Sequence, residues 1–186
     1  MIPPSATYIA NYVGEAAEAE LVASIDAAPW RDDLRRRVQH YGFRYDYKAR
    51  RITADSYLGP LPEWLATVAS RLQRQGVFED VPDQVIVNEY LPGQGIARHI
   101  DCEPCFGDTI ASLSLGSPCT MEFADTRSDE ERSQRLERGS LLILKGESRF
   151  QWQHGIPARK SDRVEGAVVP RGRRISLTFR NVIQDS

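Results

Sequence analysis

Residues 84–101 read QVIVNEYLPGQGIARHID, and this stretch indicates both a strand and a place where reactive side chains gather. Its first part, residues 84–91, is rich in β-branched and apolar residues, which favours a strand. A turn containing proline and glycine follows at residues 92–95. Asn88 and Tyr90 are two residues apart, so they share one face of the strand and can donate an amide and a phenol hydroxyl to one ligand.

Most of the predicted strands follow the predicted helices in the chain. A first strand is predicted at residues 8–13, followed by helices at 15–28 and 63–75, each with apolar residues recurring on one face. Beyond residue 84, short strands bounded by glycine or proline are predicted at 109–115, 119–123, 140–145 and 173–182. This order predicts an α+β domain with a jelly-roll core, that is, a double-stranded β-helix, and N-terminal helices packed outside it.

One segment interrupts the strands. Residues 125–138 are densely charged with both signs mixed, which predicts a solvated excursion, either a short surface helix or a mobile loop. With 186 residues, 41% hydrophobic content and a formal charge of -2, we expect one domain spanning residues 1–186 and a monomer. The longest apolar runs, such as residues 141–144, are too short to cross a bilayer, and the first residues lack the pattern of a signal peptide. We therefore expect a cytoplasmic protein without membrane association.

The cysteines are few. Three of them, Cys102, Cys105 and Cys119, make an odd number, which argues against a disulfide framework and fits a reducing compartment. Cys102 and Cys105 have the spacing of zinc or thiol-redox sites, but no second pair exists. We therefore interpret them as an incidental pair.

A metal site is predicted from His99 and Asp101. They are two residues apart, so on an extended strand both side chains leave the same face and can share a metal. The pair arises easily by chance, and an isolated histidine is more often a hydrogen-bonded structural residue. The chain has only three histidines, however, and His154 lies at another junction of strands. Two histidines and one carboxylate form the ligand face of non-haem Fe(II) oxygenases.

Two arginines lie on the last predicted strand, residues 173–182. Arg174 and Arg180 are six residues apart, so they point to one face together with Ser176. Buried guanidinium groups are costly unless anions neutralise them, and a dicarboxylate co-substrate supplies one anion at each end. Salt bridges to protein carboxylates are the alternative interpretation.

Residues 31–51 are strongly basic and aromatic. Cations suit phosphates and planar rings suit exposed bases, which predicts a flap that grips a nucleotide. The same alternation also fits a half-buried β-hairpin with a solvated basic face. The residues of interest are Arg35, Arg36, Arg37, Tyr41, Arg44 and Tyr45. A pI near 6 excludes a uniformly basic surface, so nucleic-acid contact has to come from such a local patch.

Taken together, the sequence resembles the AlkB family of Fe(II)- and 2-oxoglutarate-dependent dioxygenases. The resemblance extends in order from about residue 8 to residue 183, and it is strongest in the stretches NEYLPGQGIARHID, SLSLGSPCTMEF, RGSLLILKGESRFQWQHGI and RRISLTFRNV. Within the family, the phrases PGQGIARHID, SLSLGS and GESRFQW are most similar to the branch that hydroxylates wobble uridine in tRNA. We expect none of the RNA-recognition or methyltransferase domains of that branch in these 186 residues.

The resemblance implies roles by position. His99, Asp101 and His154 would ligate Fe(II). Within the co-substrate site, Arg174 would pair with the distal carboxylate of 2-oxoglutarate, helped by Tyr90, and Asn88 and Arg180 would lie near its metal-chelating end. Ser176 would lie in the same co-substrate site. The founding repair enzyme has an asparagine at this position, whereas the tRNA-hydroxylase branch has a serine, as this chain does.

The same resemblance implies a nucleic-acid substrate. Residues 31–51 fall where the family has its nucleotide-recognition lid, and Glu103 falls where the repair enzyme has an aspartate that touches the target base. With Fe(II), 2-oxoglutarate and O2, such an enzyme either demethylates alkylated single-stranded DNA or RNA or hydroxylates a modified tRNA uridine. A protein or small-molecule hydroxylase with the same iron site, and a non-catalytic nucleic-acid binding module, remain the alternatives.

Overall fold

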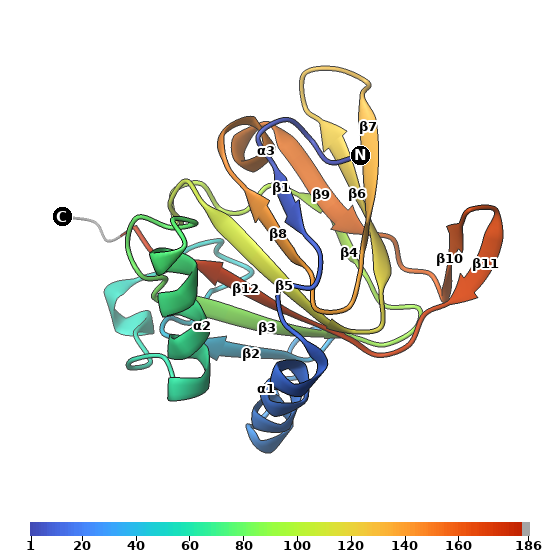
Figure 1. The fold of residues 1–186 in the computed structure, drawn as a ribbon. Helices are drawn as coiled ribbons and strands as arrows, with labels where there is room; N and C mark the ends of the chain where they lie inside the picture. The colour runs from blue at the N-terminus through green and yellow to red at the C-terminus, as the bar shows by residue number, and fades with distance from the viewer. Residues whose placement is uncertain (184–186) are drawn as a thin grey trace.

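A computed structural model describes residues 1–183 and shows two antiparallel β-sheets that face each other (Figure 1). The larger sheet has the strand order β1 (Thr7–Ile9), β8 (Leu141–Leu144), β5 (Ile110–Gly116), β12 (Arg174–Arg180), β3 (Gln84–Tyr90) and β2 (Val38–Tyr41). The smaller sheet has the order β4 (Ile96–His99), β9 (Trp152–Ile156), β6 (Cys119–Asp125) and β7 (Glu131–Leu136). The prediction of a jelly-roll core is confirmed.

Helices are few and lie outside the sandwich. Two of them, α1 (Glu15–Ala27) and α2 (Glu63–Arg74), cover the outer face of the larger sheet (Figure 1). The others are a 3₁₀ turn, η1 (Ala54–Ser56), and the short helix α3 (Gly146–Phe150). Both predicted helices are present to within one residue of their predicted ends. Among the described residues, no helix has the length and apolar character needed to cross a bilayer.

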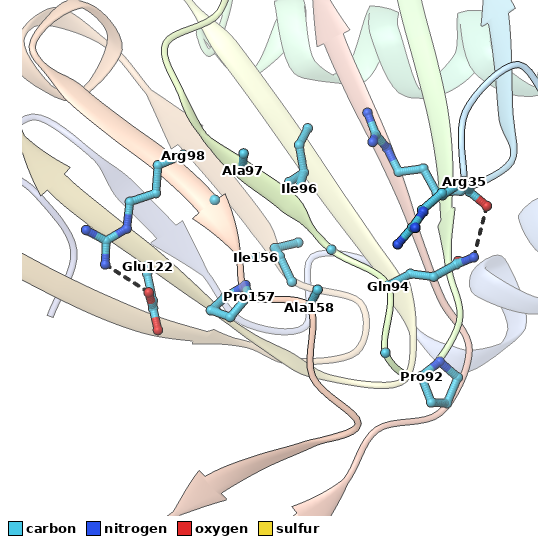
Figure 2. A pocket seen from close by; sticks show the side chains of 14 residues that line it. Arg35, Pro92, Gln94, Ile96, Ala97, Arg98, Glu122, Ile156, Pro157 and Ala158 are labelled. Atoms are coloured by element: carbon cyan, nitrogen blue, oxygen red, sulfur yellow. Dashed lines mark hydrogen bonds and ion pairs between the residues drawn. The ribbon is translucent and has the colours of Figure 1, made fainter.

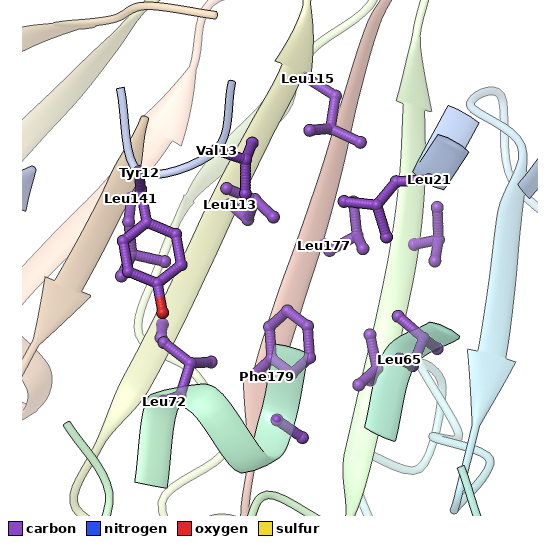
Figure 3. Packing of buried hydrophobic residues seen from close by; sticks show 14 of the residues in the cluster. Tyr12, Val13, Leu21, Leu65, Leu72, Leu113, Leu115, Leu141, Leu177 and Phe179 are labelled. Carbon is purple, nitrogen blue, oxygen red and sulfur yellow. The ribbon is translucent and has the colours of Figure 1, made fainter. Parts of the chain in front are cut away.

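Strict alternation along β12 decides which side chains face the helices. Leu177 and Phe179 point outward and pack with Leu113, Leu65 and Leu21 in one apolar cluster (Figure 3). Because successive side chains of a strand leave opposite faces, the polar residues of β12 point inward, between the two sheets. The outer cluster therefore fixes the register that turns the polar face toward the second sheet.

A second apolar cluster lies between the sheets. It combines Ile110 and Leu142 of the larger sheet with Phe123, Trp152 and Ile156 of the smaller one. These side chains are almost fully buried, and each stabilises the fold by roughly 1.5–3 kcal/mol relative to exposure. The polar inward face of β12 is thus enclosed by an apolar wall.

The charged segment 125–138 differs from its prediction as a surface helix or loop. β6 continues to Asp125, and Glu131–Leu136 forms β7, which pairs with β6 at the edge of the smaller sheet. On this strand, Arg132 covers the ring of Trp152, with 5.3 Å between guanidinium and centroid. Charged side chains are common on edge strands because they discourage pairing with other chains.

The cysteine prediction is also wrong. Cys102 and Cys105 form a disulfide, with their Cα atoms 5.3 Å apart, whereas Cys119 is free and buried. A tight turn, in which the backbone N–H of Cys105 donates to the carbonyl of Cys102, brings the two side chains together. An odd total of cysteines does not exclude a local pair of this kind.

A hairpin of β10 (Ser161–Val164) and β11 (Ala167–Pro170), which was not predicted, projects from the body of the protein (Figure 1). At its base, the buried carboxylate of Asp162 accepts hydrogen bonds from Arg171 at 2.7 and 2.8 Å and from Arg159 at 2.9 Å. Burial alone raises the pKa of Asp162, but the two arginines outweigh it and lower the pKa to about 2.

Asp162→Asn is expected to lower the free energy of unfolding by roughly 2 kcal/mol at neutral pH. Because the pKa of Asp162 is lower in the folded chain than in the unfolded one, this stabilisation is complete above about pH 4 and is lost as the pH falls toward 2. Urea unfolding of the wild type, Asp162→Asn and the exposed control Asp129→Asn across this range measures it. A pH-independent difference between Asp162→Asn and the wild type would contradict the assignment.

Candidate metal and co-substrate site

Three potential metal ligands meet between the sheets. His99 ends β4, His154 lies opposite it on β9, and Asp101 follows two residues after β4. Asp101 Oδ1 lies 3.3 Å from His99 Nε2 and 3.5 Å from His154 Nε2, and the two imidazole rings are 4.5 Å apart. Their ligand atoms all lie within 4.8 Å of one another, so this trio fits a single metal ion.

The imidazole rings are oriented for metal binding. His99 Nδ1 lies 2.8 Å from the carbonyl oxygen of Ala97, which fixes the proton on Nδ1 and leaves Nε2 as an acceptor. His154 Nδ1 is buried and has no hydrogen-bond partner in the described part of the chain. The Nε2 atoms of both rings face Asp101, as a shared ion requires.

Arg180 holds the carboxylate in place. Its Nε and Nη2 atoms both lie 2.7 Å from Asp101 Oδ2, which leaves Oδ1 toward the histidines. Burial raises the pKa of Asp101, but the charge of Arg180 and the histidine contacts outweigh it and hold the pKa well below its usual value. Burial lowers the pKa of His154. An ionised carboxylate and a neutral imidazole are the states that bind metal.

Arg149 supports the same loop and was not predicted. It is 2% exposed and donates to the carbonyl oxygens of Asp101 at 2.9 Å, Cys102 at 3.4 Å, Phe106 at 3.3 Å and Gly107 at 3.1 Å. One guanidinium therefore gathers the loop that begins with the candidate carboxylate ligand. Nothing in the local pattern marks it, because a single arginine in a short helix is usually exposed.

Arg149→Met is expected to weaken Fe(II) binding by about 10- to 100-fold, as loss of an outer support of a metal ligand commonly does. The loop carbonyls would lose their donors while all three ligands remain. Anaerobic Fe(II) titration, beside the exposed control Arg127→Met, measures the effect. An unchanged iron affinity in a variant with lowered thermal stability would assign Arg149 to folding alone.

A small cavity of about 60 Å³ lies beside the ligand trio. At its far end, Arg174 is 2% exposed, donates to Ser114 Oγ at 3.0 Å and lies 5.3 Å from the ring centroid of Tyr90. Its Nε atom is buried without a partner, and no carboxylate among residues 1–183 pairs with it. Asn88 and Ser176 line the same space. A buried guanidinium without a counter-ion indicates a site for an anionic ligand.

The two arginines of β12 thus differ. The alternative of a salt bridge to protein holds for Arg180, whose counter-ion is Asp101, but not for Arg174. Asn88 accepts a hydrogen bond from Arg36 Nε at 2.9 Å through its Oδ1, which leaves its amide hydrogens available to a ligand. The cavity therefore has the guanidinium of Arg174 at one end and the candidate metal ligands at the other.

A wider pocket of about 300 Å³ opens on the other side of the trio. It shares Asn88, His99, Asp101 and Arg180 with the small cavity. The segment 31–51 contributes four of its other lining residues, which are Arg36, Tyr45, Tyr47 and Arg50. The candidate metal ligands therefore lie between an inner cavity lined by Arg174 and an outer pocket bordered by rings and cations.

Tyr47 was not among the predicted site residues. Its hydroxyl is buried with no hydrogen-bond partner in the described structure, and burial raises its pKa to about 12. Its ring meets that of Tyr45 edge to face at 5.1 Å. A neutral phenol with a free donor is suited to contact a ligand in the wider pocket.

Two of the predicted substrate-binding residues, Arg37 and Tyr41, point away from both pockets. Arg37 pairs with Glu89 at 2.9 Å, and Tyr41 packs edge to face against Trp64 at 5.4 Å. The reason is register, because β2 pairs with β3 and its odd-numbered residues turn toward the helices. Two further predicted residues, Arg44 and Glu103, are exposed and line neither pocket.

Comparison with known proteins gives a consistent picture. Residues 30–180 match the 2OG-Fe(II) oxygenase superfamily. The chain is 36% identical over 202 residues to the "Alkylated DNA repair protein ALKBH8 homolog" of Arabidopsis thaliana, covering 96% of this chain and 58% of that protein. It is 34% identical over 208 residues to the "tRNA (carboxymethyluridine(34)-5-O)-methyltransferase ALKBH8" of Mus musculus, covering 97% of this chain and 31% of that protein.

The chain thus spans less than two thirds of either relative. A solved structure, that of OsALKBH1, superposes with a TM-score of 0.71 at 21% identity and covers 97% of this chain and 98% of its own, which shows the shared fold. The superfamily match covers most of the chain and includes the ligand trio and Arg174. A third relative, the "Probable RNA/DNA demethylase ALKBH6" of Danio rerio, is 30% identical over 209 residues, which cover 97% of this chain and 86% of that protein. The chain therefore belongs to the AlkB family of the 2OG-Fe(II) oxygenase superfamily, dioxygenases that use Fe(II), 2-oxoglutarate and O2.

Proposed function

We propose that this protein oxidises a nucleobase in single-stranded DNA or RNA, or in an RNA loop, by removing an N-methyl group or by hydroxylating a modified uridine. The observation that carries this proposal is the wider pocket, where Tyr45, Tyr47, Arg36 and Arg50 lie beside the candidate ligands His99 and Asp101, and where these two arginines form no ion pair among the described residues. Its volume lies at the lower end of the range typical of small-ligand sites, about 300–1,000 Å³.

Within this proposal, His99, Asp101 and His154 hold Fe(II), and Arg174 binds the distal carboxylate of 2-oxoglutarate in the small cavity. Bound iron and 2-oxoglutarate together supply the activation of O2 that oxidises a C–H bond and releases succinate and carbon dioxide. The chain's own part is to keep Asp101 ionised and to surround the site with apolar side chains, which exclude water.

The cations of segment 31–51 divide into two groups. Arg31 and Arg37 are paired with Asp33 and Glu89. The other cations form no ion pair within residues 1–183, and they are Arg35, Arg36, Arg44, Lys48, Arg50 and Arg51. Cations without protein partners beside stackable rings suit a polyanion whose bases are exposed. We infer that a target base stands between Tyr45 and the iron site, with backbone phosphates near Arg36 and Arg50.

The two chemical outcomes share one step, hydroxylation of a carbon attached to the base. A hydroxylated N-methyl group collapses to formaldehyde and the unmodified base, whereas a hydroxyl on a uridine side-chain carbon remains. The names of two relatives refer to repair of alkylated DNA and to carboxymethyluridine at position 34 of tRNA. Ser176, which lines the small cavity, favours the tRNA-modifying outcome by its resemblance to that branch.

The test incubates the pure protein with Fe(II), 2-oxoglutarate, methylated oligonucleotides and bulk tRNA, and reads nucleosides by mass spectrometry. Formaldehyde with loss of a methyl group supports demethylation, and a gain of one oxygen on a tRNA nucleoside supports hydroxylation. No change in either nucleic acid, together with 2-oxoglutarate turnover on peptides or metabolites, would replace this proposal with a protein or small-molecule hydroxylase.

A further inference from the structure

A second and larger cleft, of about 780 Å³, adjoins the wider pocket (Figure 2). The two share Arg36, Ile96, Ala97 and Arg98, so the cleft lies next to the pocket that contains His99 and Asp101. We call this cleft the neighbour groove. Its other lining residues are Arg35, Pro92, Gly93, Gln94, Gly95, Glu122, Gly155, Ile156, Pro157 and Ala158.

The arginines of the neighbour groove differ in whether a carboxylate of the protein neutralises them. Arg98, on one side, is neutralised by Glu122 at 2.9 Å and by Glu131. Arg35, which lies on the other side in Figure 2, forms no ion pair among the described residues, and neither does Arg36. The groove therefore presents two uncompensated guanidinium groups on the side nearest the lid.

The position of Arg35 is fixed by its backbone. Gln94 Nε2 donates to the carbonyl oxygen of Arg35 at 3.0 Å, which ties the start of the lid to the loop between β3 and β4 (Figure 2). This contact leaves the guanidinium group free. A held backbone with a free cation presents a charge at a defined place, which lowers the entropy cost of binding an anion there.

Between its charged sides, the groove is lined by the apolar side chains of Ala97, Pro157 and Ala158, and the backbone of β4 pairs with that of β9 beneath them. A Cβ atom at Gly95 would lie 2.1 Å from the carbonyl oxygen of Ile156, so only glycine permits an approach this close. An apolar lining beside two cations matches one nucleotide, whose sugar or base rests on the lining while its phosphate meets the cations.

We propose that the neighbour groove binds the nucleotide adjacent to the oxidised one in the same strand, with the connecting phosphate on Arg35 and Arg36. This inference rests on the proposed function and narrows its substrate to an oligonucleotide of at least two residues. A free modified nucleoside fills the wider pocket alone and lacks the contacts of the groove.

The test compares one modified base as nucleoside, as dinucleotide and as pentanucleotide, with kcat and KM measured separately. In the wild type, kcat/KM is expected to rise on the order of tenfold from nucleoside to dinucleotide. In Arg35→Glu, the ratio of kcat/KM for the dinucleotide to kcat/KM for the nucleoside is expected to fall toward one, mainly because KM for the dinucleotide rises. The control Arg74→Glu makes the same charge change on α2, on the helix-covered side of the protein, and keeps the wild-type ratio.

Binding of a labelled, unmodified pentanucleotide, followed by fluorescence anisotropy at several salt concentrations, gives a readout independent of activity. Loss of one phosphate contact in Arg35→Glu should lower the slope of log affinity against log salt by about one. Equal kcat/KM ratios, or unchanged pentanucleotide affinity and slope in Arg35→Glu, would overturn the groove assignment. Absence of any base oxidation would instead refute the proposed function. The pentanucleotide affinities measured by anisotropy would still show whether Arg35 in the groove contacts a phosphate.

Discussion

Asp101→Asn is expected to lose stoichiometric Fe(II) binding and to lower the rate of 2-oxoglutarate turnover on the order of 10³-fold. The amide is a poor ligand, and it leaves the guanidinium of Arg180 buried without its counter-ion, an imbalance that typically costs about 3–5 kcal/mol. Iron content measured by anaerobic dialysis, together with succinate formation, checks the expectation.

The matched control for this change is Asp108→Asn, which makes the same substitution at an exposed position of the same loop. Because Asp101→Asn also disturbs Arg180, His99→Ala serves as a second variant. It removes one candidate ligand and leaves the ion pair of Asp101 with Arg180 intact. If a folded His99→Ala variant bound iron and turned over like the wild type, the ligand assignment would be wrong.

Arg174→Met is expected to raise the KM for 2-oxoglutarate by roughly 10²-fold while iron binding in the absence of 2-oxoglutarate stays as in the wild type. The buried guanidinium has no carboxylate partner in the described structure, so a bound dicarboxylate would supply it, and such a charged pair contributes about 2–5 kcal/mol to binding. Initial rates at varied 2-oxoglutarate concentration give the KM.

Arg163→Met, on the projecting hairpin, makes the same change at an exposed arginine and should keep the wild-type KM. The two variants separate loss of a specific anion contact from loss of general positive charge. Equal KM values for Arg174→Met and the wild type would show that the co-substrate binds elsewhere.

The sequence predicted the inward polar face well, because a strand's period of two is read directly from spacing. Arg174, Ser176 and Arg180 share one face of β12, and Asn88 and Tyr90 lie on the same side of β3, as expected. The meeting of His99 and His154 needed more, since β4 and β9 are far apart in sequence and pair only in the folded sheet. The family resemblance, and not the spacing, predicted that these two histidines share one metal ion with Asp101.

Other features depended on tertiary register and were missed or misjudged. Arg37 and Tyr41 face the helices because β2 joins the larger sheet beside β3, which composition does not reveal. The charged residues of β7 form an edge strand because β6 is available to pair with them. Arg149 is buried only because the loop after Asp101 folds over it, so no local pattern could have identified it.

Binding of the two cofactor components to one protein tests the central claim most directly. If the ligand trio and Arg174 form one site, anaerobic titration should find one Fe(II) per chain, and 2-oxoglutarate should bind much more tightly with Fe(II) present than without it. By linkage, 2-oxoglutarate should then raise the affinity for Fe(II) by the same factor. Independent binding of the two, or full iron binding by His99→Ala, would contradict a single shared site.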